Sequence, residues 1–199
     1  MLGSLVAFAL AAGLLTITPG PDTAIVLRAA ASGPRAGAAT ALGVIGGLFV
    51  WGVAAAFGLG ALLAASPTAY LVLKWVGAAY LVFVGIRMIA RPRTLFDSTS
   101  GAGAGSLRRG FFTNVLNPKV GVFYATFLPQ FVPAGAPVAA FCLALAGVHA
   151  ALTLIWFAAL IGLAAPLGRW LRRPSVVRNM DRTTGGVFVA FGLKLALRP

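Results

Sequence analysis

Long stretches without a charged residue dominate this sequence. Residues 1–21, 36–73 and 120–168 contain no Asp, Glu, Lys or Arg. A membrane-spanning helix needs about 20 apolar residues, so the 49 residues of the last stretch have room for two crossings and a turn. Only 10% of the 199 residues are charged, against about 25% in a soluble domain. A soluble enzyme and a disordered chain are excluded, and the unbroken apolar runs lack the alternation of an outer-membrane barrel.

The apolar runs predict an all-α membrane protein with six transmembrane helices. The predicted spans are residues 2–27, 38–64, 70–89, 110–132, 138–167 and 183–197. A Gly/Ser/Ala-rich stretch at 98–106 is typical of a flexible linker. It divides the single membrane domain into a three-helix unit at 1–90, a linker loop at 91–109 and a three-helix unit at 110–199. Because no Lys or Arg precedes the first run, we expect a retained span rather than a cleaved signal peptide.

Lys and Arg gather in the breaks that follow the odd-numbered spans. Twelve lie there: Arg28, Arg35, Arg87, Arg91, Arg93, Arg108, Arg109, Arg169, Arg172, Arg173, Arg178 and Arg182. Only Lys74, Lys194 and Arg198 fall on the opposite side. The positive-inside rule therefore predicts that the odd-numbered loops are cytoplasmic and that both termini are outside. Since topology accounts for the net charge of +13, we expect no nucleic-acid partner.

The two halves of the chain match each other at two constant offsets. At an offset of 107, residues 85–92 (GIRMIARP) and 192–199 (GLKLALRP) share a glycine, a cation, an arginine and a proline. At an offset of 97, residues 13–22 and 110–119 share a glycine, a threonine and a proline. Chance similarity between apolar segments is the alternative. Because each half has three spans, a duplicated second half would insert upside down, which is a common way to build a transporter.

Spans 1 and 4 carry proline breaks at corresponding positions. Thr18-Pro19-Gly20-Pro21 interrupts the first, where two prolines remove backbone donors and Gly20 permits unusual dihedral angles. Asn117-Pro118 interrupts the fourth, as an N-cap followed by proline at the first helical position. Unwound backbone survives in a membrane only where it faces protein or a water-filled cavity. Paired breaks therefore predict a binding site between the two halves.

Two charges lie inside the spans, directly after these breaks and opposite each other in the repeat. Asp22 either complements the dipole of a helix start or acts in function, as intramembrane carboxylates do by default. Lys119 stands at a helix N-terminus, where the dipole disfavours a cation. It therefore needs an anion, either Asp22 or a substrate carboxylate, unless it snorkels to an interface. The other acidic residues, Asp97 and Asp181, are expected in cytoplasmic loops.

Further polar residues are candidates for the same cavity. Asn114 and Asn117 could supply hydrogen bonds there or merely cap and bridge helices. His149 is either a proton relay or a hydrogen-bonded structural histidine. The glycines of the cluster Gly43–Gly47 are expected to allow close helix packing rather than to line a pathway.

Together these motifs resemble the LysE/RhtB family of bacterial inner-membrane amino-acid exporters over nearly the whole chain. The resemblance rests on Thr18–Asp22, the glycines of Gly43–Gly47, Tyr80–Gly85 and above all Gly110–Lys119, with Phe127–Phe131 after it. It implies export of amino acids or close derivatives, such as homoserine and its lactone, driven by the proton gradient. We expect no enzymatic activity and no cofactor.

The expected mechanism places a zwitterionic amino acid between the two halves. Its ammonium would meet Asp22 and unwound carbonyls near Thr18 and Gly20, and its carboxylate would meet Lys119 and the helix start near Asn117. Protonation of Asp22 from outside would promote release. The alternative is a metal-ion or other small-solute exporter on a related bundle, although one Cys and one His are few ligands for a metal. So small a bundle is compatible with a homodimer.

Overall fold

The computed structural model describes residues 2–92, 106–133, 135–171 and 173–197, and within them every regular element is helical. The elements are α1 (Leu2–Ile17), α2 (Pro21–Ala31), α3 (Pro34–Ala65), α4 (Pro67–Ala90), α5 (Leu107–Val115), α6 (Pro118–Val122), the π-helix η1 (Phe123–Phe127), the 3-10 helix η2 (Leu128–Phe131), α7 (Val138–Gly162), α8 (Ala164–Leu171) and α9 (Pro174–Leu197). The all-α prediction is therefore confirmed for these residues. Asp97 and most of the predicted linker lie outside them.

Two helices are long and apolar enough to cross a membrane by themselves. They are α3, through Pro34–Gly58, and α7, through Val138–Gly162. The pair α1 and α2 forms a third span if it is taken as one helix with a 55° bend at the proline break. Among the described residues the structure thus supports two or three spans. Six spans and the inverted repeat stay predictions.

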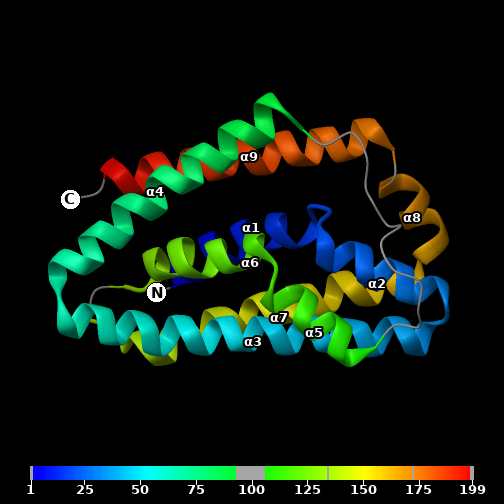
Figure 1. Cartoon of the computed structure of the whole chain (residues 1–199), viewed down its shortest axis with the longest axis horizontal. Coiled ribbons are helices and arrows are strands. Elements are labelled where there is room, and N and C mark those ends of the chain that lie inside the picture. The colour runs from blue at the N-terminus through cyan, green and yellow to red at the C-terminus, as the bar shows by residue number, and fades with distance from the viewer. Residues whose placement is uncertain (1, 93–105, 134, 172, 198–199) are drawn as a thin grey trace.

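Helices from equivalent positions of the two halves lie side by side. Figure 1 shows α3 running antiparallel to α7, and α4 antiparallel to α9. A Cβ added at Gly85 would lie 2.6 Å from the Gly185 carbonyl oxygen, and one at Gly192 would lie 2.8 Å from that of Ala78. These two contacts are related by the offset of 107 that relates the halves in sequence, as a pseudo-two-fold axis between α4 and α9 would require.

Glycines also bring α3 and α5 into backbone contact. A Cβ at Gly43 would lie 2.0 Å from the Leu107 carbonyl oxygen, and one at Gly110 would lie 2.0 Å from that of Thr40. A Cβ at Gly47 would lie 2.5 Å from Oδ1 of Asn114. The packing role predicted for the glycine cluster is confirmed at positions 43 and 47. At position 46 there is room for a methyl group, 3.5 Å from the Phe111 ring.

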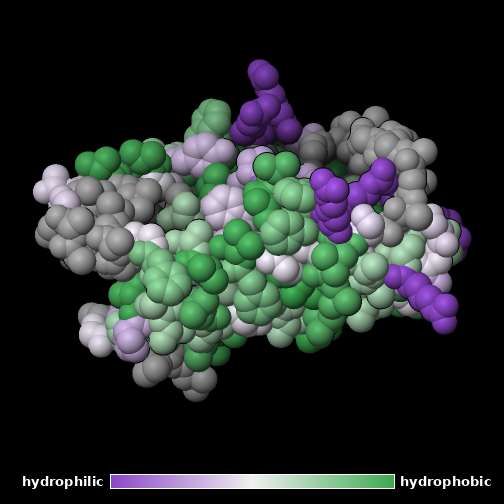
Figure 2. Space-filling model, turned by 60° about the horizontal axis from the view of Figure 1, so that its bottom comes forward, coloured by the Kyte–Doolittle hydropathy of each residue, from purple (hydrophilic) through white to green (hydrophobic). Residues whose placement is uncertain are grey.

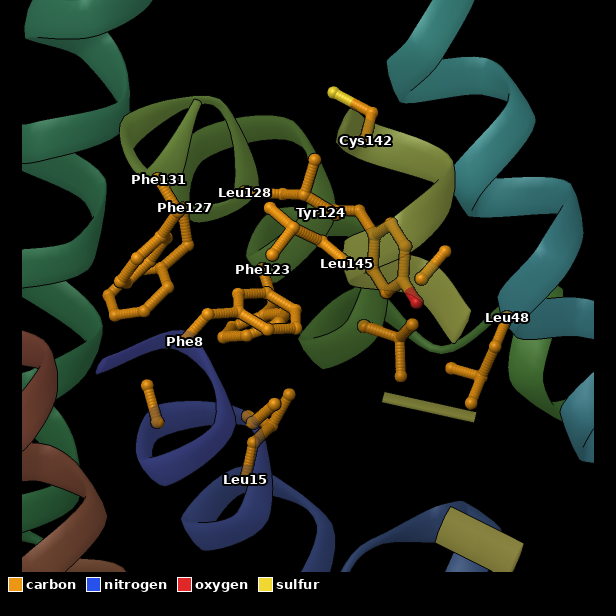
Figure 3. Packing of buried hydrophobic residues seen from close by; sticks show 14 of the residues in the cluster. Phe8, Leu15, Leu48, Phe123, Tyr124, Phe127, Leu128, Phe131, Cys142 and Leu145 are labelled. Atoms are coloured by element: carbon orange, nitrogen blue, oxygen red, sulfur yellow. The ribbon is translucent and has the colours of Figure 1, made fainter. Parts of the chain in front are cut away.

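Aromatic rings form the main core between α1, η1, η2 and α9 (Figure 3). The Phe8 ring packs against Phe123 and Phe131, with ring centroids 5.7 and 5.4 Å apart. Phe127 packs against Phe191 of α9 at 4.3 Å. Because Phe8 precedes the end of α1 by more than two turns, this aromatic cluster fills the bundle on the N-terminal side of the break.

The basic segment after span 5 differs from the prediction. It was expected to be a loop that ends before Thr183, but α8 continues to Leu171 and α9 begins at Pro174. Asp181 therefore lies inside α9 and is only 1% exposed, so its placement in a loop was wrong. Arg178 and Arg182 on the same helix stay exposed. The run of charged residues predicted a solvated loop. A helix, however, can bury one polar residue while its neighbours in sequence face outward.

Large apolar side chains cover the outside of the long helices. On α4, Val72, Val76 and Phe83 are 58, 61 and 58% exposed, and on α3 Phe57 is 66% exposed. Figure 2 shows a broad hydrophobic surface with hydrophilic side chains gathered toward one side and the upper edge. An apolar surface of this extent is unusual for a soluble monomer and is expected of helices that face lipid.

Candidate functional site

The first break leaves one carbonyl at the end of α1 without a backbone N–H donor. Pro19 has no N–H, so the Leu15 carbonyl loses the donor that an unbroken helix would provide. The chain is extended at Gly20 (φ −158°, ψ −174°), and α2 begins at Pro21. The Ala24 N–H then donates to the Gly20 carbonyl at 2.9 Å. The predicted interruption is confirmed at Thr18–Gly20, and the helix resumes at Pro21.

Lys119 reaches across from the second half of the chain to this break. Its Nζ donates to the carbonyl oxygens of Leu15 at 2.8 Å and Thr18 at 3.0 Å. The C-terminal end of a helix carries partial negative charge, so α1 stabilises the ammonium group. The backbone of Lys119 lies at an unfavourable helix start, but its side chain ends at the favourable end of another helix. Carbonyl oxygens of α1 thus compensate the positive charge of Lys119, a role for which the sequence suggested only a carboxylate.

The second break holds Asp22 between two amides. Asn117 is extended and caps α6, since its Oδ1 accepts from the Lys119 backbone N–H at 3.1 Å. Its Nδ2 donates to Oδ2 of Asp22 at 3.1 Å, and Nδ2 of Asn114 donates to the same oxygen at 2.8 Å. Pro118 occupies the first turn of α6, as predicted. The structure therefore brings residues from both breaks into one cluster.

Two acceptor atoms in this cluster have no donor. Oδ1 of Asp22 and Oδ1 of Asn114 are buried and make no hydrogen bond. Buried polar atoms are nearly always paired, because an unpaired one costs about 1–3 kcal/mol. Unsatisfied acceptors beside a carboxylate suit a ligand rich in N–H or O–H donors. Water, an ammonium group or a proton on Asp22 would each satisfy part of this need.

A cavity of about 30 Å³ lies at the cluster. Its lining includes six of the predicted residues, which are joined there by apolar side chains from α1, α3 and α7: Thr18, Gly20, Asp22, Asn114, Asn117 and Lys119. The volume is enough for about one or two water molecules and too small for an amino acid. The helices must therefore separate before a substrate of that size can enter.

Hydroxyl groups and a histidine complete the lining, and sequence reasoning missed most of them. Thr16, Thr23 and Thr153 face the cavity together with His149. Nδ1 of His149 lies 3.2 Å from the Tyr124 hydroxyl, and Nε2 lies 3.1 Å from the Thr16 hydroxyl. The ring is buried, so the structural alternative for His149 has direct support. Single threonines in apolar helices carry no pattern by which the sequence could mark them.

Thr18 and Gly20 contribute through the backbone more than through side chains. The Thr18 hydroxyl donates to the Leu14 carbonyl at 2.7 Å and hydrogen-bonds to the Thr184 hydroxyl of α9. The backbone carbonyl of Thr18 is one of the two that accept from Nζ of Lys119. A Cβ at Gly20 would lie 3.7 Å from Nζ of Lys119, which is ordinary contact. A glycine at position 20 is therefore not required to leave room for the Lys119 side chain.

An apolar helical bundle with two broken helices that meet at a pair of charged side chains is the architecture of a membrane transporter. The LysE type translocator family model matches residues 14–198, and the chain belongs to this family. It is 29% identical to the uncharacterized membrane protein YrhP of Bacillus subtilis, over 98% of this chain and 99% of that protein. It is 31% identical to a homoserine/homoserine lactone efflux protein of Salmonella typhi (96% and 94% covered) and 30% identical to a leucine efflux protein of Klebsiella pneumoniae (92% and 89% covered). No solved structure matches the chain.

Family membership supports a transport role in a membrane rather than an enzymatic one. The residues of the site do not add support to the alternative of a metal exporter. Within the part of the chain that the structure describes, no three His, Cys, Asp or Glu side chains converge as metal ligands.

Proposed function

We propose that this protein exports amino acids or close derivatives across the bacterial inner membrane in exchange for protons. The observation that carries the proposal is that one carboxylate and one ammonium, those of Asp22 and Lys119, line the same cavity at two facing helix breaks. A zwitterion has the complementary pair of charges. The efflux functions in the names of the Salmonella and Klebsiella relatives support the same substrate class.

The substrate ammonium would bind at Asp22. Oδ2 already accepts from Asn114 and Asn117, which fix the carboxylate in place. Oδ1 and the amide oxygen of Asn114 are the buried acceptors without donors. An ammonium has three N–H donors, so it satisfies both atoms and one further acceptor.

The substrate carboxylate would bind Lys119 and draw it from α1. In the present state the ammonium of Lys119 donates to the carbonyls of Leu15 and Thr18. The Thr18 carbonyl is one of those near which we expected the substrate's own ammonium, the other being that of Gly20. A carboxylate competes well for a lysine, because charge-assisted hydrogen bonds between ions are the stronger kind. Movement of Lys119 would free these carbonyls. Substrate binding and the conformation of the break are thereby coupled.

Protons would drive release at Asp22. When Asp22 is open to the outside, a proton on Oδ1 neutralises the carboxylate and removes its attraction for the substrate ammonium. The protonated carrier then returns, and the proton leaves to the cytoplasm. Each cycle moves a substrate out and a proton in.

The aromatic cluster around Phe8, Phe123 and Phe127 would form the barrier on the outer side of the cavity. These rings are fully or almost fully buried, with Phe8 tilted against Phe123 and Phe127 stacked on Phe123. They lie toward the start of α1, which the cation distribution assigns to the outside. The π-helix η1 carries Phe123 and Phe127, and such segments often mark functional sites in helices.

Homoserine and homoserine lactone make a matched pair of test substrates, because the lactone keeps the ammonium but has no free carboxylate. We expect proteoliposomes with wild-type protein to transport both. Lys119→Met should lower homoserine transport at least tenfold and lactone transport much less, whereas Lys194→Met, at an exposed position, should change neither. Lactone transport also shows that the variant is folded. An equal loss of both substrates in folded Lys119→Met protein would refute the carboxylate assignment, and no transport of homoserine, its lactone or leucine by the wild type would refute the proposed function.

A further inference from the structure

The residues that line the central cavity fall into two groups by the helices that carry them. The charged residues and the asparagines come from the breaks and from α2, α5 and α6. Another part of the lining comes from α3 and α7, which lie side by side (Figure 1). The mechanism proposed above gives this α3–α7 wall no role. It consists of Val44, Leu48, His149, Thr153 and Phe157.

The spacing of these residues makes the α3–α7 wall a continuous surface. Val44 and Leu48 are four residues apart on α3, and His149, Thr153 and Phe157 follow one another at intervals of four on α7. Residues four apart lie on the same face of a helix. Separation of the helices would widen the cavity but leave each residue on the same face of its helix. The wall therefore still faces the site when a substrate enters.

The shape of an amino acid directs its side chain toward this wall. The α-carbon carries three groups besides hydrogen, and the proposed function, on which this inference rests, places two of them. The ammonium binds at Asp22 of α2 and the carboxylate at Lys119 of α6. The third group then faces the part of the cavity that α3 and α7 supply. The α3–α7 wall is thus the surface that meets the substrate side chain.

Four threonines line the cavity, and Thr153 is the one that belongs to this wall. The Thr16 hydroxyl donates to a carbonyl of its own helix and lies 3.1 Å from a ring nitrogen of His149. The Thr18 hydroxyl bonds to a carbonyl of α1 and to a hydroxyl of α9. Thr23 directly follows the carboxylate residue in α2 and so belongs to the ammonium end. Thr153 is therefore the hydroxyl placed for a substrate side chain.

The chemistry of the α3–α7 wall suits a short aliphatic chain that ends in a hydroxyl. Both ring nitrogens of His149 already lie within hydrogen-bonding distance of hydroxyl groups of the protein. The Thr153 side chain is 3% exposed, and a threonine hydroxyl has one donor and two acceptor lone pairs. It can therefore pair with a substrate hydroxyl even while its own O–H bonds to the helix. Val44, Leu48 and Phe157 supply apolar surface for methylene groups.

We propose that Thr153 is a specificity-determining residue that selects substrates with a hydroxyl group on a short aliphatic side chain. The substrate hydroxyl pairs with Thr153, and the methylene groups pack against the apolar residues of the wall. A substrate with a methyl group in place of the hydroxyl leaves Thr153 without this hydrogen bond in a site that excludes water. Such a substrate binds more weakly, because a site built to bind a hydroxyl discriminates against the analogue that lacks it.

Homoserine and norvaline are the matched substrates for a test, because norvaline has a methyl group where homoserine has its hydroxyl. Initial rates of export from proteoliposomes are measured for each at the same internal concentration, below saturation. We expect the wild type to export homoserine about three- to tenfold faster, which corresponds to about one hydrogen bond. Thr153→Val makes the same exchange of hydroxyl for methyl in the protein and keeps the branched side chain. It should export the two substrates at nearly equal rates, with its norvaline rate unchanged, whereas Thr153→Ser should keep the preference.

Thr40→Val is the matched control for removal of a buried threonine hydroxyl. Thr40 is fully buried on α3, its hydroxyl donates to the Ala36 carbonyl at 2.9 Å, and it is not among the residues that line the cavity. This variant should keep the wild-type ratio of the two rates. A general loss of folded protein lowers both rates and leaves their ratio unchanged, so the ratio reports recognition of the side chain alone.

Three results would overturn the role of Thr153 while leaving the proposed function intact. They are equal export of homoserine and norvaline by the wild type, an unchanged preference in Thr153→Val, and an equal loss of the preference in Thr40→Val. Export of neither substrate by the wild type would refute the proposed function, and this inference with it.

Discussion

Replacing Gly110 by alanine tests whether α3 and α5 lie close enough to set the geometry of the site. The added methyl carbon would lie 2.0 Å from the Thr40 carbonyl oxygen, whereas ordinary contact begins at 3.4 Å. The helices must therefore separate by about 1.4 Å at this point. Asn114 lies one turn further along α5, and its 2.8 Å hydrogen bond to Asp22 would exceed hydrogen-bonding distance after such a shift.

The expected cost follows from two opposing terms. Overpacking costs about 1–3 kcal/mol, and alanine recovers about 0.5–1 kcal/mol in a helix relative to glycine. A net loss of about 1–2 kcal/mol lowers the melting temperature by about 2–8 °C for a chain of this size. Thermal unfolding in one detergent measures this shift, and export from proteoliposomes should fall at least tenfold.

Gly13→Ala is the matched control, because Gly13 aligns with Gly110 in the repeat but has nothing within 4 Å of its added Cβ. This variant should melt at or slightly above the wild-type temperature and export normally. If Gly110→Ala were as stable and as active as Gly13→Ala, the close approach of α3 and α5 would be refuted.

Four other variants, at three positions, separate structural from transport roles. Asn117→Ala should destabilise the protein by about 1 kcal/mol in thermal unfolding through loss of the cap, whereas Asn117→Asp should keep the cap and still lose export, because a second carboxylate faces Asp22; normal export by Asn117→Asp would contradict this role. Thr184→Val removes the hydroxyl that pairs with Thr18 and should cost about 1 kcal/mol in the same assay while export continues, so an unchanged melting temperature would show that the pair contributes nothing. His149→Gln should retain proton-coupled export within about twofold, since glutamine also hydrogen-bonds on both sides; loss of the response to a pH gradient would instead assign a proton relay.

The breaks and their charges were predictable because proline acts locally. Pro19 and Pro118 affect the backbone in the same way in any surroundings, since each lacks an N–H and fixes its own φ. The offset between the halves then placed Asp22 opposite Lys119 without any knowledge of the fold. That part of the site required only the spacing of residues along the chain.

The acceptors of Lys119 and the burial of Asp181 depend on tertiary structure and were not predictable. The Leu15 carbonyl has no backbone donor because of Pro19, but only the tertiary fold brings it within reach of the Lys119 side chain. Asp181 belongs to a basic segment that looks solvated in sequence, and the packing of α9 alone buries it. The threonines of the cavity were missed for the same reason. Only the direction in which their side chains point in the folded bundle distinguishes them from other threonines.

The central claim is that Asp22 binds the substrate ammonium and the driving proton in turn. The most direct measurement compares wild-type and Asp22→Asn protein in proteoliposomes, with export of one transported amino acid followed while the outside is made acid. We predict that the acid gradient accelerates wild-type export and that Asp22→Asn, which retains the shape of the side chain, exports at least tenfold more slowly with no response to the gradient. Asp22→Asn protein that exports at the wild-type rate and still responds to the gradient would contradict the account.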